Sequence, residues 1–123
     1  MRILIADRQA KVRSALRLLL EQQPGLWILG EAVDATGVLD WTKVACPDVI
    51  LVGWDLPGLQ VPDTLAQLRA VRPHLAIVAL SGRPEAYSAA MAGGVDAFVS
   101  KGDPPERLLA ALDSLGRRGQ HDQ

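Results

Sequence analysis

PDVILVGWDLPG, residues 47–58, is the stretch of this 123-residue sequence that decides the fold. Residues 49–53 are apolar at consecutive positions and do not alternate with polar ones. That pattern is typical of a strand that is buried on both faces of a parallel sheet. Pro47 before the run and Pro57-Gly58 after it mark turns and keep the strand short. The stretch therefore predicts a central strand of an α/β sheet.

Further apolar runs rich in isoleucine, valine and leucine lie on both sides of this strand. They are residues 3–6, 27–32, 77–80 and 95–99. The segments between and after the runs have apolar residues at helical spacing, and these are residues 9–22, 36–45, 61–71, 84–91 and 104–115. Because crossovers between parallel strands are right-handed, this alternation predicts a doubly wound sheet with helices on both faces. The predicted fold class is α/β, a flavodoxin-like (βα)5 three-layer sandwich with strand order 2-1-3-4-5.

Length and composition favour a globular domain without nucleic-acid or membrane partners. Thirteen basic and fourteen acidic residues leave a net charge of −1, so no overall field attracts nucleic acid or anionic lipid. No apolar run is long enough to span a membrane, and a cytoplasmic location is expected. Residues 1–116 are expected to form the domain. The polar residues 117–123 are expected to form a flexible tail.

Chemistry in such sheets collects at the carboxyl ends of the strands, near the point where the strand order reverses. The polar or special residues at these ends are Asp7, Arg8, Gly53, Asp55, Ser81 and Lys101. No glycine-rich phosphate loop follows the first strand, and no Ser-His-Asp or Cys-His grouping is present. An enzyme, or a cofactor-binding module of flavodoxin-like shape, is therefore the less favoured hypothesis. Flavin or nucleotide titration would reveal such a module.

Four segments together resemble the receiver domain of two-component response regulators. These are ILIAD at residues 3–7, the opening stretch at 47–58, LSG at 80–82 and FVSK at 98–101. The resemblance runs from Arg2 to about Leu115. KGDPPERLL at 101–109 is most similar to receivers of regulators with a helix-turn-helix output. Too few residues follow Leu115 for such an output, so we expect either a stand-alone receiver or a piece of a longer regulator.

The resemblance implies a degenerate phosphorylation site. In the family, acidic residues after the first strand bind Mg²⁺, and an aspartate that ends the third strand accepts the phosphoryl group. Asp7 matches the first acidic residue, but Arg8 stands where a second carboxylate is usual. Gly53 stands at the phosphoacceptor position and has no nucleophile. We therefore expect no catalytic residue, no cofactor, and lost or weak Mg²⁺ binding, because Mg²⁺ prefers several oxygen ligands.

Other parts of the family's pocket are retained. Ser81 matches the hydroxyl that contacts the phosphoryl group, and Lys101 matches the cation that pairs with it. Without a phosphoryl group, Lys101 is expected to pair with Asp7, and Ser81 to bond to nearby backbone. Phe98 matches the aromatic residue on the fifth strand that rotates on activation; the alternative is an ordinary core residue.

Two functional hypotheses follow from the resemblance. The first is an atypical receiver that acts through phosphorylation-independent protein–protein contacts. Its partner would be another protein or a second copy, bound by the face of the fourth helix, fifth strand and fifth helix. The second is a receiver that is phosphorylated at a non-standard residue such as Asp55. Three tryptophans add to these expectations: Trp27 is predicted in the core, whereas Trp41 and Trp54 are either exposed anchors for a partner or partly buried.

Overall fold

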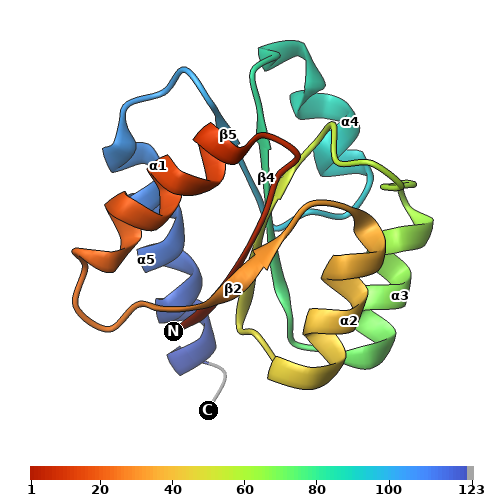
Figure 1. Ribbon diagram of the computed structural model, residues 1–123, viewed down its shortest axis with the longest axis horizontal. Helices are drawn as coiled ribbons and strands as arrows, with labels where there is room; N and C mark the ends of the chain where they lie inside the picture. Colours follow the sequence, from red (N-terminus) through yellow and green to blue (C-terminus); the bar gives the residue numbers. More distant parts are fainter. Residues whose placement is uncertain (122–123) are drawn as a thin grey trace.

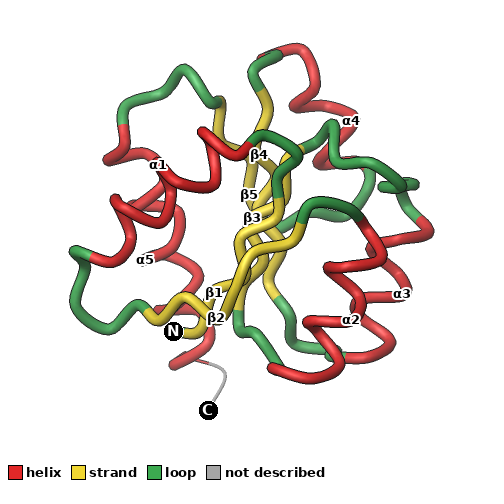
Figure 2. The backbone as a smooth tube through the Cα atoms, in the orientation of Figure 1, coloured by secondary structure: helices red, strands yellow, loops and turns green. Residues whose placement is uncertain are grey.

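A five-stranded parallel sheet forms the centre of the molecule, in the order β2-β1-β3-β4-β5 (Figure 1, Figure 2). The computed structural model describes the backbone of residues 1–121 and the side chains of residues 1–117. The strands are β1 Arg2–Ala6, β2 Trp27–Ala32, β3 Val49–Gly53, β4 Ala76–Ser81 and β5 Ala97–Ser100. The predicted fold class and strand order are confirmed.

Helices cover both faces of the sheet, as the alternating pattern predicts. Within residues 1–121 they are α1 Ala10–Glu21, α2 Ala35–Ala45, α3 Asp63–Val71, the short 3₁₀ helix η1 Pro84–Ala86, α4 Tyr87–Ala92 and α5 Pro105–His121. Figures 1 and 2 show α1 and α5 on one side of the sheet and α2, α3 and α4 on the other. None of the helices in this part of the chain is both long and apolar enough to cross a membrane.

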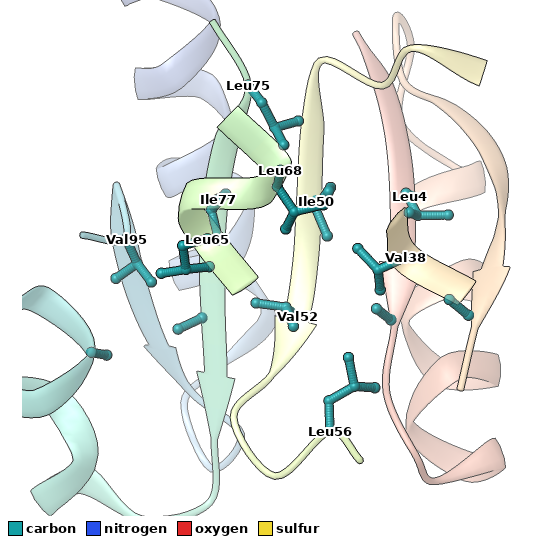
Figure 3. Close-up of a cluster of buried hydrophobic side chains, with 14 residues drawn as sticks. Leu4, Val38, Ile50, Val52, Leu56, Leu65, Leu68, Leu75, Ile77 and Val95 are labelled. Atoms are coloured by element: carbon teal, nitrogen blue, oxygen red, sulfur yellow. The ribbon is translucent and has the colours of Figure 1, made fainter. Parts of the chain in front are cut away.

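The central strand β3 has no exposed residue, and its side chains alternate between two apolar layers. Ile50 and Val52 point toward α2, α3 and α4, where they meet Leu65 and Leu68 of α3 (Figure 3). Val49 and Leu51 point to the opposite layer under α1 and α5. Because both faces of the strand are buried, consecutive apolar residues were needed. The interpretation of residues 49–53 as a central parallel strand is therefore confirmed.

The last helix is longer than the sequence pattern predicts. We expected it to end near Leu115 and residues 117–123 to form a flexible tail, but α5 continues to His121. No proline follows Leu115 to stop the helix. Arg117 also lies one turn after Asp113, with Nη1 3.1 Å from Oδ2, a spacing that supports helix. Residues 122 and 123 of the predicted tail lie outside the described residues.

One of the three tryptophans, Trp27, differs from the prediction. Trp27 was expected in the core but is 68% exposed. It begins β2, an edge strand that pairs only with β1 in the sheet, so less structure is available to cover it. Trp41 and Trp54 are half-buried and pack against the apolar layer under α2 and α3. Of the two alternatives for Trp41 and Trp54, partial burial is the one observed.

Gly30 allows α2 to lie close to β2, and we predict that Gly30→Ala destabilises the fold. A Cβ at residue 30 would lie 2.5 Å from Cζ2 of the Trp41 indole, so the half-buried ring must shift. Such overpacking typically costs about 1–3 kcal/mol. Urea unfolding followed by tryptophan fluorescence should show a lower midpoint and a changed native spectrum.

Gly82→Ala is the matched control, because a Cβ at residue 82 meets nothing within 4 Å. It should leave both the midpoint and the native spectrum close to those of the unmodified chain. Equal losses of stability in the two variants would contradict the role assigned to Gly30.

Candidate functional site

The predicted pocket residues come together at the carboxyl ends of the strands, away from the N-terminus (Figure 1). Asp7 follows β1, Gly53 ends β3, Ser81 ends β4 and Lys101 follows β5. Backbone hydrogen bonds join these ends, because Lys101 N–H donates to the Ser81 carbonyl oxygen at 2.8 Å. Trp54 N–H likewise donates to the carbonyl oxygen of Leu80 at 2.8 Å. The parallel sheet therefore brings distant parts of the chain to one edge.

Asp7 is the most constrained polar side chain of the pocket, with 0% exposure. Its Oδ1 accepts a hydrogen bond from Gln9 N–H at 2.8 Å. Its Oδ2 lies 2.8 Å from Lys101 Nζ, and the Lys101 side chain is 21% exposed. The Oδ2 contact is an ion pair without an aligned hydrogen bond, so this buried oxygen has no hydrogen-bond donor among the described residues. The predicted pairing of Asp7 with Lys101 is confirmed.

Gly53 faces the Asp7 carboxylate directly. A Cβ on residue 53 would lie 2.4 Å from Asp7 Oδ2 and 3.0 Å from its Cγ. The backbone there is not the reason for glycine, because the glycines with positive φ are Gly25, Gly58 and Gly94. The close approach of the Asp7 carboxylate is what distinguishes this position. The Asp7 carboxylate occupies the volume that a side chain on residue 53 would need.

The two other charged residues predicted for the pocket, Arg8 and Asp55, are exposed. The Asp7 carboxylate is paired with Lys101, while Arg8 extends toward solvent. Asp55 Oδ1 lies 3.4 Å from the place of a Cβ on residue 53. The Asp55 carboxylate is therefore at the rim of the same small volume that the Asp7 carboxylate fills.

Ser81 and Phe98 are both present at the site, in environments that differ from each other. Ser81 is 8% exposed, and its Oγ accepts a hydrogen bond from Arg83 N–H at 3.1 Å. The prediction that it bonds to nearby backbone is confirmed. Phe98 in β5 is half-buried and packs edge-on against Tyr87 of α4, with ring centroids 5.6 Å apart and planes at 89°. Such edge-to-face pairs favour one ring orientation.

Sequence reasoning missed the residues that hold Asp7 in place. The Gln9 N–H bond is the local pattern in which an aspartate accepts from the backbone two residues later, so it could have been expected. Arg13 could not have been found by a local pattern. Its Nη1 donates to the Asp7 carbonyl oxygen at 2.9 Å, and its Nε donates to Glu31 Oε1 at 3.0 Å. Arg13 lies in α1 and Glu31 in β2, so only the folded chain brings them together.

Glu31 anchors this support from the edge strand β2. It also accepts from Arg17 Nε at 2.8 Å, so two guanidinium groups share one carboxylate. The hydrogen bond from Arg17, and then that from Arg13, hold the pKa of Glu31 below its ordinary value despite partial burial. The hydrogen bond to Glu31, and then that to Glu21, raise the pKa of Arg17. The network ties α1 to the sheet next to the pocket.

The residues present do not fit a Mg²⁺ ion at this site. One Asp7 oxygen accepts from Gln9 and the other is paired with Lys101. Within the described part of the chain, no three histidine, cysteine, aspartate or glutamate side chains cluster closely enough to hold a metal. Mg²⁺ needs an octahedral shell of oxygen ligands. The Lys101 ammonium would compete with Mg²⁺ for the buried carboxylate of Asp7.

Comparison with known proteins supports the resemblance found in the sequence. Residues 3–113 match the family model of the response regulator receiver domain. The nitrate/nitrite response regulator protein NarP of Escherichia coli (strain K12) is 31% identical over 112 residues, which cover 89% of this chain and 52% of that protein. The chain thus spans about half the length of the curated relatives it matches.

Solved structures show the same fold. A two-component response regulator of the LuxR family from Aurantimonas sp. SI85-9A1 superposes with a TM-score of 0.83 at 25% identity, covering 93% of this chain and 83% of that one. RcsB from Salmonella enterica serovar Typhimurium, bound to a promoter in the presence of a phosphomimetic, superposes with a TM-score of 0.82 at 25% identity, covering 94% and 98%. The resemblance to receivers of regulators with a DNA-binding output is therefore shared by sequence and structure.

We predict that Glu31→Gln weakens the support of α1 in a pH-dependent way. Since the pKa of Glu31 is lower in the folded chain than its ordinary 4.5, its contribution to stability is present above that value and is lost as the pH falls through the folded pKa. At neutral pH the variant should lose about 0.5–1 kcal/mol of unfolding free energy, as for partly exposed pairs. Urea unfolding across a pH series measures the difference.

The control is Glu21→Gln, which removes only the exposed pair with Arg17 within α1. It should change the unfolding free energy less than Glu31→Gln at neutral pH, where both carboxylates are charged. A difference between the unmodified chain and Glu31→Gln that persists at a pH well below 4.5 would show that charge is not the cause.

Proposed function

The chain belongs to the family of response regulator receiver domains, and we propose that it serves two-component signal transduction without accepting a phosphoryl group. One observation carries the proposal. At the end of β3 there is no carboxylate, and the space beside Gly53 is filled by the Asp7 carboxylate. The chain therefore presents an occupied pocket instead of a reactive one.

Chemistry explains why this pocket does not suit phosphorylation. An acyl phosphate forms when a carboxylate oxygen is aligned with the phosphorus of the donor. Gly53 offers no such oxygen. Asp7 is fully buried, and its two oxygens are engaged by Gln9 N–H and Lys101 Nζ. Neither the phosphoryl donor nor a Mg²⁺ ion has a free carboxylate at the centre of the pocket, and we expect Mg²⁺ binding to be lost or weak.

Signalling without phosphate requires a surface that is already formed. A ligand shifts a conformational equilibrium only by its different affinity for the two states, and in this chain the lysine that would recognise a phosphoryl group already has an anion at 2.8 Å. We therefore assign the chain a constitutive binding role and no catalytic activity of its own.

The face made by α4, β5 and α5 is the proposed site for a protein partner or a second copy. Tyr87 and Met91 of α4 expose 54% and 38% of their surface there, and Tyr87 covers Phe98 of β5. Large exposed side chains of these kinds are common anchors at protein interfaces. A cytoplasmic location stays a prediction for this chain. The absence of direct nucleic-acid contacts also stays a prediction, because the similar RcsB is a regulator bound to a promoter.

Phosphorylation at Asp55 is the second candidate function. Asp55 is exposed to a donor, and its Oδ1 lies 3.4 Å from the place of a side chain on residue 53. Its carboxylate is thus closer to the pocket than its position in a loop after the strand suggested. It ranks second because it approaches the pocket from the rim, and no side chain of residues 1–117 forms an ion pair with it.

We predict that the unmodified chain gains no phosphoryl group when it is incubated with acetyl phosphate and Mg²⁺. Intact mass spectrometry measures the result directly. Asp55→Asn, measured beside it, separates the two candidate functions. An increase of one phosphoryl mass in the unmodified chain that disappears in Asp55→Asn would overturn the first function in favour of the second.

Gly53→Asp tests whether the scaffold itself remains competent. It supplies a carboxylate at the end of β3 and keeps Asp7, which matches one of the family's acidic residues after the first strand. We expect phosphorylation of this variant to exceed that of the unmodified chain. Equal modification of both would place the reaction elsewhere in the chain, and peptide mapping would then locate it.

A further inference from the structure

An apolar surface lies along the free edge of the sheet, where β2 stands beside α2 (Figure 1). Three large apolar side chains that are more than half exposed contribute to it: Trp27 at 68%, Val33 at 51% and Val44 at 83%. The half-buried Leu29 and Trp41 belong to the same surface. These five residues are called the edge patch below. Exposed apolar patches on a folded domain mark interaction sites, and the proposed function makes no use of this one.

Contacts between α2 and β2 bring the edge patch together. The Trp41 indole lies against Gly30 of β2. At the start of the strand, Arg2 is the register partner of Trp27, so the two side chains leave the sheet on the same face. The Arg2 guanidinium donates to the carbonyl oxygen of Cys46 at 3.2 Å, which places the end of α2 near Trp27. The end of the helix and the start of the strand therefore share one surface.

One flank of α2 continues the patch toward the other end of the helix. Gly37, Trp41 and Val44 follow one another at spacings of four and three residues, which puts them on one side of the helix. Val33 lies four residues before Gly37, just ahead of α2. Leu39 lies on the opposite flank and packs against the core. The patch thus runs the length of α2.

The outer edge of β2 is irregular, so a partner meets side chains and not a regular backbone edge. Ile28 is the register partner of Ile3 and Gly30 that of Leu4, which leaves Leu29 as a bulge. Bulges in edge strands disfavour the addition of a further strand. A partner at this edge is therefore expected to pack on the apolar side chains.

We propose that the edge patch is a contact surface between two copies of this chain, related by a two-fold axis with their α2 helices antiparallel. A two-fold interface presents the same patch twice, so the two ends of the patch must complement each other. Trp27 and Val44 lie at one end and Val33 at the other. The inference goes beyond the proposed function, because it assigns the second copy to this edge and leaves the α4–β5–α5 face to a different protein.

Charges at the two ends of the patch support a second copy as the partner. Arg2 lies at the end with Trp27, and no carboxylate among the side chains of residues 1–117 forms an ion pair with it. Asp34 lies at the other end, beside Val33. Its Oδ1 accepts from Gly37 N–H at 2.8 Å, and it has no ion-pair partner in the same part of the chain. With antiparallel α2 helices, Arg2 of each copy meets Asp34 of the other.

Sedimentation velocity over a wide range of protein concentration tests the proposal. Because α2 has only 11 residues, or about 16 Å of helix, the interface is small and the dimer should dissociate on dilution. Val44→Glu brings a carboxylate close to Val33 and Asp34 of the other copy. It should raise the dissociation constant of the dimer by roughly tenfold or more. A chain that stays monomeric at every concentration would overturn the proposal.

Two control variants make this test specific. Leu18→Glu changes a residue of α1 that is 64% exposed outside the patch, and it should leave the dissociation constant unchanged. Tyr87→Glu changes the exposed residue of the α4–β5–α5 face and should also leave it unchanged. A dimer that is lost in Tyr87→Glu and kept in Val44→Glu would place the second copy on that face and contradict the proposal.

A double-mutant cycle tests the antiparallel arrangement. Asp34→Asn keeps an oxygen that can accept from Gly37 N–H, so the start of α2 stays capped. Arg2→Gln and Asp34→Asn should each raise the dissociation constant by about two- to fivefold, as expected for two exposed ion pairs. The double variant should be no weaker than the weaker single variant, because both changes remove the same pairs. Additive effects would overturn the arrangement. These outcomes are distinct from a failure of the proposed function, which depends on whether the unmodified chain gains a phosphoryl group.

Discussion

β1 and β3 run through the middle of the sheet, where helices on both faces bury β3 and all of β1 after Arg2. That constraint demands consecutive apolar residues along the buried strands. Because the strands are parallel, their carboxyl ends lie at one edge of the sheet. The same constraint buries Asp7, the first polar residue after β1. Asp7 has 0% exposure, so its charge is costly unless it is balanced inside the molecule.

The residues around Asp7 compensate the charge of its buried carboxylate. Lys101 supplies the cation from the end of β5, Gln9 and Arg13 hold Asp7 on its other sides, and Gly53 leaves room for the carboxylate between them. A buried pair of this kind is weak evidence for stability in general, because desolvation offsets much of the attraction. Its value here is positional, since it places Lys101 and the β5–α5 junction relative to β1 without any ligand.

Family membership and local chemistry answer different questions about this chain. The match over residues 3–113 and the strand order place it among receiver domains, and with them in two-component signalling. The chemistry at the strand ends departs from what that family resemblance implies, with Arg8 and Gly53 in place of carboxylates. Fold alone does not decide function, so the proposal of a phosphate-independent role rests on the side chains of the pocket.

The sequence by itself determined the sheet, its order and the list of residues at the strand ends. The strands and helices depend on local periodicity, which a buried parallel strand or an amphipathic helix must display wherever it lies, and the order is a common one for doubly wound sheets of this alternation. The Asp7–Lys101 pair was predictable because two buried opposite charges at one sheet edge have few other partners. Only the tertiary structure decided that Trp27 lies exposed on an edge strand and that α5 continues to His121. It alone showed that Asp7 fills the volume beside Gly53 and that Arg13 bridges Asp7 and Glu31. These contacts join residues from different elements, and their geometry exists only after the sheet has brought the elements together.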